Sequence, residues 1–326
     1  MDLGDLDVSQ LPRRRKETGW LKVASRPDGG DWRLPFLYVT GKADGPTLLV
    51  IAGVHGDEYE GVEAIPLIFQ SVQPDALRGT LLMVPVCNMP AYEAATRSSP
   101  LDGLNLARVF PGDANGSITQ RIAHGVTEKL MKGSDLLIDL HSGGVTYHIP
   151  TLVGYSQSED DLGRRSLAAA RAFGAPILWG HPPPVPPGRS IRAAVDLGVP
   201  WIYTEAAGGG FARPEDVALY RDGVLRVMQG LGMLEGAPAP GPVTHHLVGS
   251  GDLDQVILAS VAGYYRTEVG LLDEVKAGQR LGVVQDFFGQ VLAEIRADRD
   301  GVVIMLRRLA RVQAGDGLAH LTSHLG

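Results

Sequence analysis

The sequence of 326 residues has a single cysteine, Cys87, so it can form no internal disulfide and no thiolate metal site. Because Cys87 lies at the end of an apolar run, we expect a buried and inert thiol. No apolar run approaches the roughly 18 residues that a membrane helix needs, and the acidic N-terminus lacks the pattern of a signal peptide. These absences predict a cytoplasmic protein that does not span a membrane.

Basic residues are also fewer than acidic ones. The chain has 30 Lys and Arg against 37 Asp and Glu, and the net charge of −7 argues against nucleic acid or an anionic membrane as a partner. The basic run 13–16 could be an interaction patch, but in an acidic chain we favour a solvated N-terminal arm over residues 1–19. Apolar residues make up 44% of the chain, which predicts a globular protein with a sizeable core.

The hydrophobic pattern changes once along the chain. Residues 34–40 indicate an edge strand, because Pro35 cannot donate to a ladder. After this, apolar runs alternate with helical patterns, which predicts an α/β fold. The expected strands cover 47–52, 80–87, 136–140, 151–154, 176–179 and 199–203, and the expected helices cover 58–70, 117–132, 161–173 and 216–231.

Residues 236–242 have the composition of a linker, and only short strand-like runs follow them. These runs cover 256–262, 264–269, 280–285, 290–297 and 301–306. Regular short strands with turns between them are typical of a small β-sandwich or barrel. We therefore predict a catalytic domain over 1–240 and a smaller all-β domain over 241–326.

Two strand ends carry residues that bind metals. His55 and Glu58 follow the buried strand 47–52 after a break at Gly53, and His141 follows the strand 136–140. One His–Glu pair alone is more often a surface hydrogen bond. Two His and one Glu at strand ends, however, form the ligand set of a catalytic zinc with an open position for water.

Other features near these strands have two readings each. Asp139 lies two residues before His141 and so on the same face of its strand. It either orients a zinc ligand or is a buried structural carboxylate. The proline-rich loop 181–188 either forms a pocket wall or is a plain surface connection.

Taken together, His55-x-x-Glu58, His141 and Glu205 before the glycines 208–210 resemble the succinylglutamate desuccinylase/aspartoacylase family of the zinc carboxypeptidase clan. Residues 105–112 resemble its Asn/Asp-Leu-Asn-Arg-x-Phe-Pro motif, with Thr96-Arg97 before it and Arg189-Ser190-Ile191 after it. The resemblance covers about 47–231, and the β-rich tail looks like the family's C-terminal domain. The sequence around Glu58 looks closest to bacterial deacylases, including those that deacetylate N-acetyl-diaminobutyrate in ectoine breakdown.

The resemblance implies a zinc-carboxypeptidase-like mixed sheet flanked by helices and one Zn²⁺ per chain. The roles that it implies are His55, Glu58 and His141 as metal ligands, Glu205 as general base, Arg97 as oxyanion donor, and Arg108, Arg189 and Asn105 as substrate-binding residues. Without the resemblance, Glu205 reads as a surface residue at a strand end, and each arginine as a surface charge. One position departs from the family, because Ala107 stands where the motif usually has Asn.

The chemistry predicted is hydrolysis of the amide bond of a small N-acyl amino acid that bears a carboxylate. A metal-bound water and a nearby carboxylate base are the parts that this reaction needs. A metallocarboxypeptidase acting on short peptides and a non-catalytic binding protein on the same fold are the alternatives. The sequence is compatible with a homo-oligomer and does not define the number of subunits.

Overall fold

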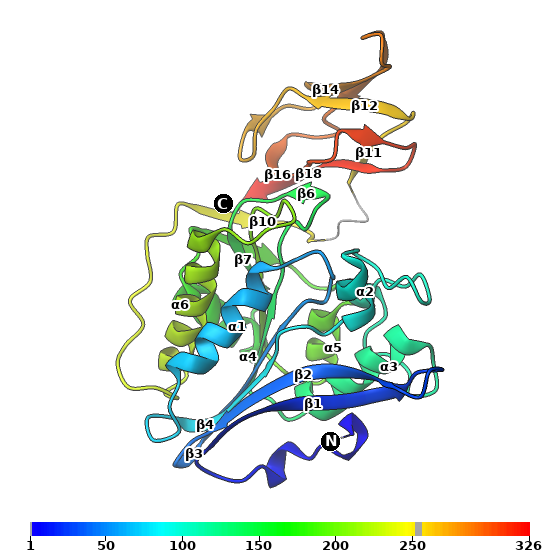
Figure 1. Ribbon diagram of the computed structural model, residues 1–326. Helices are drawn as coiled ribbons and strands as arrows, with labels where there is room; N and C mark the ends of the chain where they lie inside the picture. Colours follow the sequence, from blue (N-terminus) through cyan, green and yellow to red (C-terminus); the bar gives the residue numbers. More distant parts are fainter. Residues whose placement is uncertain (1, 252–255) are drawn as a thin grey trace.

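The computed structural model describes residues 2–251 and 256–326 (Figure 1). An α/β unit built on a mixed sheet forms the larger part, and a β-rich region stands at one end of it. This arrangement confirms the predicted fold class. Among the described residues, no helix has both the length and the apolarity needed to cross a membrane.

The central sheet runs in the order β1-β2-β4-β3-β5-β9-β7-β8-β10. Its strands β3, β4, β5 and β9 are parallel. Strand β2 runs antiparallel to both of its neighbours, and β7 runs antiparallel to β9 but parallel to β8. The bounds are β1 (Arg15–Ser25), β2 (Asp31–Thr40), β3 (Ala43–Ala52), β4 (Arg78–Val84), β5 (Leu136–Leu140), β7 (Leu152–Ser156), β8 (Ile177–His181), β9 (Trp201–Glu205) and β10 (His245–Val248). The strands β5, β7 and β8 are buried throughout, which explains their continuous apolar runs.

Helices cover both faces of this sheet. On one face α1 (Glu60–Ser71), α4 (Asp161–Phe173) and α6 (Pro214–Gly230) share a core with the sheet. On the other lie α3 (Ile118–Gly125), its π-helical continuation (Val126–Met131) and α5 (Ser190–Asp196). The short α2 (Met89–Ala94) follows β4. The bounds of α4 match the prediction, because Asp160 caps its first turn and Gly174, with φ of 80°, ends it.

Two expectations about the N-terminal part are corrected. Leu3 and Leu6 are buried and β1 begins at Arg15, so the described part of the predicted arm, residues 2–19, is not a solvated arm. The strand with Pro35 is not an edge strand either, because β2 lies between β1 and β4. The pairing with β4 covers only Leu37 to Thr40, so Pro35 has a neighbouring strand on one side alone and its missing N–H removes no bond to β4.

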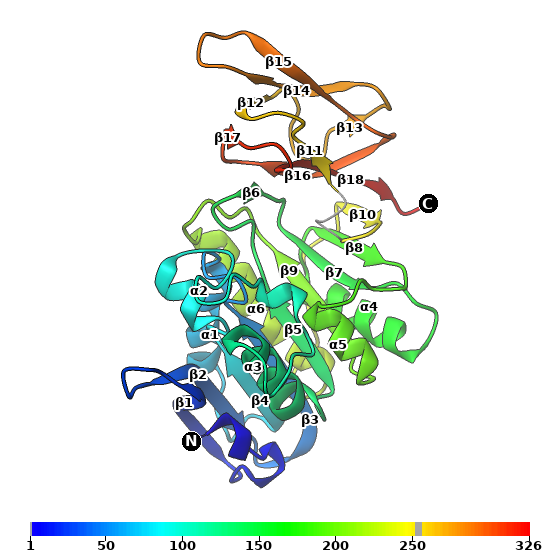
Figure 2. The same ribbon diagram turned by 90° about the vertical axis from the view of Figure 1, so that its right-hand side faces the viewer.

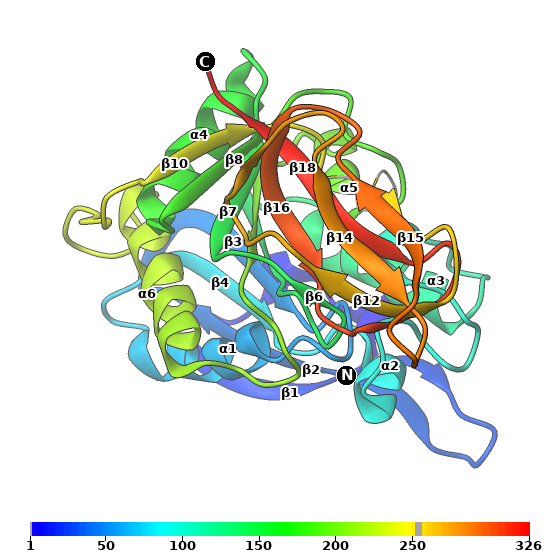
Figure 3. The same ribbon diagram turned by 90° about the horizontal axis from the view of Figure 1, so that it is seen from above.

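The β-rich region is a small sandwich, as predicted. One layer is the antiparallel sheet β15-β14-β12-β17, and the other contains β16 and β18. Seen from above, β12, β14 and β15 lie over β16 and β18 (Figure 3). Apolar residues of both layers, such as Leu281, Val284, Val303 and Leu321, form one core. The bounds are β11 (Ile257–Leu258), β12 (Gly263–Thr267), β13 (Glu274–Val275), β14 (Arg280–Gln285), β15 (Val291–Arg296), β16 (Gly301–Arg307), β17 (Arg311–Val312) and β18 (Gly317–His324).

The sandwich is joined to the central sheet by backbone hydrogen bonds (Figure 2). Strand β10 pairs with β8 in parallel on one side and with β18 in antiparallel on the other. In addition, β6 (Tyr147–His148), which follows β5, pairs with β16. The domain division at residue 240 stays a prediction, and the sheet itself continues across that point of the sequence.

Candidate active site

The register of three parallel strands brings the candidate residues to one edge of the sheet. Leu140 of β5 is opposite Ala52 of β3 and Thr204 of β9. His141 follows β5 directly, and its backbone N–H donates to Thr204 O at 3.1 Å. His55 follows β3 across a turn in which Gly53 has a φ of 57°. These residues therefore meet at the carboxyl ends of the strands, where ligands of open α/β sheets bind.

His55, Glu58 and His141 form a compact cluster. Glu58 Oε1 lies 2.7 Å from His55 Nδ1, and Glu58 Oε2 lies 2.9 Å from His141 Nδ1. One ligand atom from each residue lies within 4.8 Å of the other two, so the three could hold a metal ion. All three side chains are largely buried, which removes competing water from these atoms.

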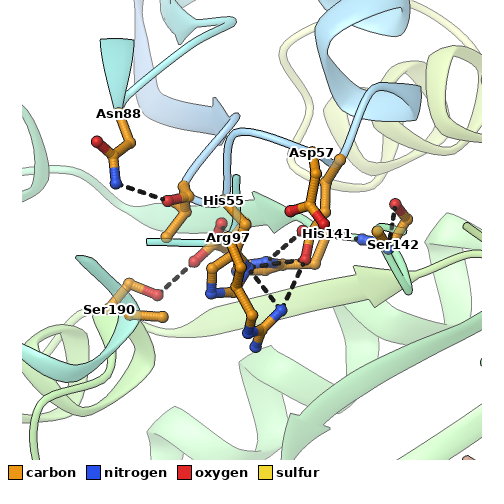
Figure 4. Close-up of polar contacts among 12 residues, drawn as sticks. His55, Asp57, Asn88, Arg97, His141, Ser142 and Ser190 are labelled. Carbon is orange, nitrogen blue, oxygen red and sulfur yellow. Dashed lines mark hydrogen bonds and ion pairs between the residues drawn. The ribbon is translucent and has the colours of Figure 1, made fainter. Parts of the chain in front are cut away.

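The other nitrogen of each imidazole faces an oxygen. His141 Nε2 lies 3.1 Å from Asp139 Oδ1, and His55 Nε2 lies 3.1 Å from Asn105 Oδ1. Asp139 is itself held by the Ser190 hydroxyl, which donates to its second oxygen (Figure 4). A carboxylate or carbonyl behind each histidine is the usual support of a metal ligand, because it fixes the ring and its tautomer. This arrangement favours the ligand-orienting role for Asp139.

The atoms that face the two ring nitrogens of His55 indicate that a cation binds here. Asn105 Oδ1 already accepts from the backbone N–H of Ala107 at 2.9 Å, so it is an oxygen and not the amide nitrogen. Burial, and then the charge of Arg97, lower the pKa of His55 to about 4, which leaves the ring with one proton. With that proton on Nε2, the lone pair of Nδ1 points at the Glu58 carboxylate. Two acceptors at that distance repel each other unless a cation lies between them, so the residues present fit a metal ion.

Charges in the cluster shift the pKa values of Glu58 and His141 in opposite directions. Burial raises the pKa of Glu58, but the charges and hydrogen bonds of both histidines outweigh it, and the net shift is downward. Burial lowers the pKa of His141, but Asp139 and Glu58 outweigh it and the net shift is upward. The cluster therefore holds a carboxylate in its charged form at neutral pH, as a metal ligand must be.

Glu205 ends β9 and lines the same cavity as the two histidines. Burial, followed by the charge of Glu58, raises its pKa to about 8, while His141 and Arg97 act in the opposite direction. Its Oε2 atom is buried, and within the described residues it has no hydrogen-bond partner. A buried carboxylate with a raised pKa and an unused oxygen is suited to accept a proton from a ligand.

Arg97 reaches the cluster from the loop after α2. Its Nη1 donates to Glu58 Oε1 at 3.2 Å and lies 3.4 Å from His55 Nδ1. In Figure 4 the guanidinium group points toward His55 and His141. The structure thus brings Arg97 together with the three candidate ligands.

The cluster opens into a cavity of about 300 Å³. Arg108 and Arg189 line it from two segments that touch, because Phe110 N donates to Gly188 O at 3.0 Å. The further lining residues are Arg97, Ala107, Asp139, Ile149, Trp179, His181, Pro182, Pro184, Val185, Pro186, Ser190, Ile191, Tyr203, Gly249, Ser250, Gly251, Ile304 and Met305. The proline-rich loop is therefore a pocket wall. Asn105 is not among the lining residues and instead contacts His55.

Sequence reasoning missed one side of the cavity. Tyr203 lies two residues before Glu205 on β9, so the strand period alone places both on one face. That signal was available. Gly249, Ser250 and Met305 come from the region after residue 240, and no local pattern indicates that they reach the cavity.

The fold and the cluster define an α/β protein with a candidate metal site at the strand ends. Residues 44–231 match the model of the succinylglutamate desuccinylase/aspartoacylase catalytic domain. The chain belongs to this family.

Its relatives match over nearly the whole chain. An N-alpha-acetyl-L-2,4-diaminobutyric acid deacetylase from Halomonas elongata is 34% identical over 306 residues, which cover 92% of this chain and 90% of that protein. The product-bound ectoine utilization protein EutE (DoeB) from Ruegeria pomeroyi has a TM-score of 0.87 at 30% identity, over 96% of this chain and 98% of the other. A succinylglutamate desuccinylase/aspartoacylase from Rhodobacter sphaeroides also has a TM-score of 0.87, at 29% identity over 99% and 98%.

Proposed function

We propose that this protein is a zinc-dependent deacylase that hydrolyses the amide bond of a small N-acyl amino acid bearing a carboxylate. The observation that carries the proposal is that His55 and His141 of the metal cluster line one cavity with Glu205, whose Oε2 has no hydrogen-bond partner among the described residues. The names of the relatives, a deacetylase and a desuccinylase/aspartoacylase, support the same reaction class.

His55, Glu58 and His141 would hold the metal. When bound, Zn²⁺ supplies Lewis-acid activation of water and of the amide carbonyl. A set of two histidines and one carboxylate is the ligand set of catalytic rather than structural zinc. Asp139 and Asn105 would keep the two imidazole rings oriented.

Glu205 is the proposed general base. It would take a proton from the attacking water and deliver it to the nitrogen of the leaving amine. The C–N bond breaks, the carbonyl carbon gains the water oxygen, and the amine leaves with the transferred proton. The raised pKa of Glu205 fits both steps, because such a carboxyl can accept and return a proton near neutral pH.

The arginines would bind negative charge. Arg97 lies closest to the cluster and is the candidate donor to the oxyanion that forms on the carbonyl oxygen. Arg108 and Arg189 are candidates for the substrate carboxylate, since a guanidinium group can bind a carboxylate with two parallel hydrogen bonds. Asn105, whose carbonyl oxygen is used by His55 and Ala107, is proposed to support the site rather than to contact the substrate.

The size of the cavity favours a small substrate over a peptide. Residues 249–251 and Met305, from the region of the sandwich, line the cavity together with the metal cluster. A volume of about 300 Å³ is at the lower end of ligand pockets and suits one acylated amino acid.

Amine release from a panel of N-acyl amino acids tests the proposal. The purified protein, assayed with its metal content measured, should release amine from at least one member. A chelator should abolish this release, and added Zn²⁺ should restore it. Activity on dipeptides that exceeds activity on every N-acyl amino acid would favour the carboxypeptidase alternative instead.

A further inference from the structure

Exposed apolar side chains gather at the outer end of the sandwich. Phe287 and Phe288, in the turn between β14 and β15, are 97% and 95% exposed, and Val291 and Leu292, which begin β15, are exposed as well. Figure 2 shows β15 at the end of the sandwich that lies farthest from the α/β unit. Single exposed apolar residues are ordinary, but a contiguous group of this kind indicates a contact surface.

Strand β15 also has a free edge. It is the last strand of the sheet β15-β14-β12-β17, and among the described strands only β14 pairs with it. Edge strands are usually protected from other chains by lysine, proline or a bulge. The six residues of β15 include no lysine and no proline, and from Ala293 onward they follow one another without a bulge. The regular stretch 293–297 is therefore open to a further strand.

The hydrogen bonds of Ala297 show which backbone groups point to this free edge. Ala297 N donates to Gln279 O at 2.9 Å, and Ala297 O accepts from Gly278 N at 2.8 Å, so both groups face the side of β14. Backbone groups of successive strand residues point to opposite sides, so Ile295 also faces β14. Glu294 and Arg296 therefore present their N–H and C=O groups to the free edge.

The same two residues have opposite charges, and both side chains are exposed. A second copy of the chain, pairing antiparallel, can form its hydrogen-bonded pairs only through Glu294 and Arg296. Three registers result, in which Glu294 faces Glu294, Arg296 faces Arg296, or Glu294 faces Arg296. The first two place like charges directly opposite each other, which destabilises a sheet. In the third, each copy contributes the charge that the other lacks.

We propose that β15 of two copies of this chain pair antiparallel across a two-fold axis, with Glu294 of each copy opposite Arg296 of the other. Ile295 then meets its own counterpart at the axis, and the two four-stranded sheets become one continuous sheet. Such an interface is isologous, because one surface of the chain is complementary to itself. The proposal does not depend on the deacylase reaction.

The area available at the hairpin is sufficient for a stable dimer. In this register the turn that holds Phe287 and Phe288 extends past the end of β15 of the other copy, toward its residues 298–300. Four phenylalanines that bury about 150–250 Å² each would contribute roughly 600–1,000 Å². Together with the paired strands, this reaches the area of about 1,200 Å² at which specific interfaces begin.

Sedimentation velocity of the full chain tests the pairing through charge reversal. The wild-type protein should sediment as a dimer, or as a multiple of one, at concentrations up to about 100 μM. Glu294→Arg and Arg296→Glu each bring like charges face to face at both symmetric positions. Each variant should weaken this association about ten-fold or more, so that the sedimenting species has half the wild-type mass at low micromolar concentration.

Mixing the two variants gives the sharpest result. Glu294→Arg offers two arginines and Arg296→Glu offers two glutamates, so an equimolar mixture should form a heterodimer although each variant alone does not dimerise. The double variant Glu294→Arg/Arg296→Glu should also regain the wild-type mass. Each single variant also loses the ion pair between Glu294 and Arg296 of its own chain, and mixing does not restore that pair. Recovery on mixing therefore has to come from contacts between chains.

Arg266→Glu is the matched control. It reverses an exposed charge on β12, which β14 separates from β15 in the same sheet, and it should leave the mass unchanged. A monomeric wild-type protein at about 100 μM would overturn the proposal. An association that neither single reversal weakens would overturn it too, since the copies would then meet through another surface. Loss in both variants without recovery on mixing would contradict the register of Glu294 opposite Arg296.

Discussion

Two buried histidines in the same cavity have pKa values that are shifted in opposite directions. His141 lies between the carboxylates of Asp139 and Glu58, and its pKa is well above the ordinary value. His181 lies between a backbone carbonyl and the Tyr203 hydroxyl, and its pKa falls to about 4. Burial lowers the pKa of both rings, so their partners make the difference.

The comparison shows how one sheet edge supplies both a charged centre and a neutral wall. Both residues stand at the carboxyl ends of buried strands, His141 directly after β5 and His181 as the last residue of β8. Only the partners differ. The carboxylates around His141 favour positive charge at that point of the cavity, and neutral groups keep His181 uncharged.

The largest fall in turnover should follow a change at Glu58, in the cluster of candidate metal ligands. Glu58→Gln keeps the size of the side chain but removes the carboxylate that both histidines face. We expect loss of the bound metal and a fall in turnover of about 10³-fold or more. Metal analysis and amine release measure both. Glu63→Gln, an exposed position on α1, is the control. Full metal content in Glu58→Gln would refute this ligand set.

Glu205→Gln should separate metal binding from proton transfer. The amide preserves size and cannot act as a base, so the variant should retain its metal and lose about 10²-fold or more in kcat. Metal analysis and initial rates on one sample make the comparison direct. Turnover close to that of the wild type would show that another group takes the proton.

Arg108→Ala tests whether the arginines that line the cavity bind the substrate carboxylate. Leaving a desolvated charge without its partner costs roughly 2–5 kcal/mol, so kcat/KM on a carboxylate substrate should fall at least about 30-fold. The loss should be much smaller on the same substrate with its carboxylate amidated. Arg121→Ala, exposed on α3, serves as the control. Equal discrimination between acid and amide in wild type and variant would show that Arg108 does not bind the carboxylate.

Because Ala107 lacks the amide of the family motif, Ala107→Asn should tighten the binding of acidic substrates.

The neutral histidine should make the stability of the fold depend on pH. The pKa of His181 rises from about 4 in the folded chain to about 6.5 in the unfolded chain, so between these values the unfolded state binds more protons. Its contribution to stability is complete above pH 6.5 and is lost as the pH falls toward 4. Between pH 7 and pH 5 the loss should be about 2 kcal/mol.

Urea unfolding of the wild type and of His181→Gln at both pH values measures this contribution. The variant lacks the titrating ring, so its stability should fall by about 2 kcal/mol less than that of the wild type over the same interval. Identical losses in the two proteins would mean that His181 is not held neutral by its surroundings.

The sequence predicts the charged centre better than the neutral wall, for a physical reason. His55, Glu58 and His141 directly follow apolar strands, so local periodicity places them at one sheet edge. The positions of Trp179 and His181 depend on Thr322 and Gly249, which reach them through the pairing of β10 with β8 and β18. Such long-range pairing leaves no local pattern. For the same reason β18 and the position of β2 inside the sheet are not predicted.

The hydrogen bond from Trp179 to Thr322 joins residues 143 positions apart in the chain. On the ribosome, the strands that carry His55, His141 and Glu205 emerge well before β18 is synthesised. A nascent chain can therefore assemble its metal ligands while Trp179 still lacks its partner and β10 lacks one of its two neighbours. The contact that fixes Trp179 on this side of the cavity can thus form only after β18 has been synthesised.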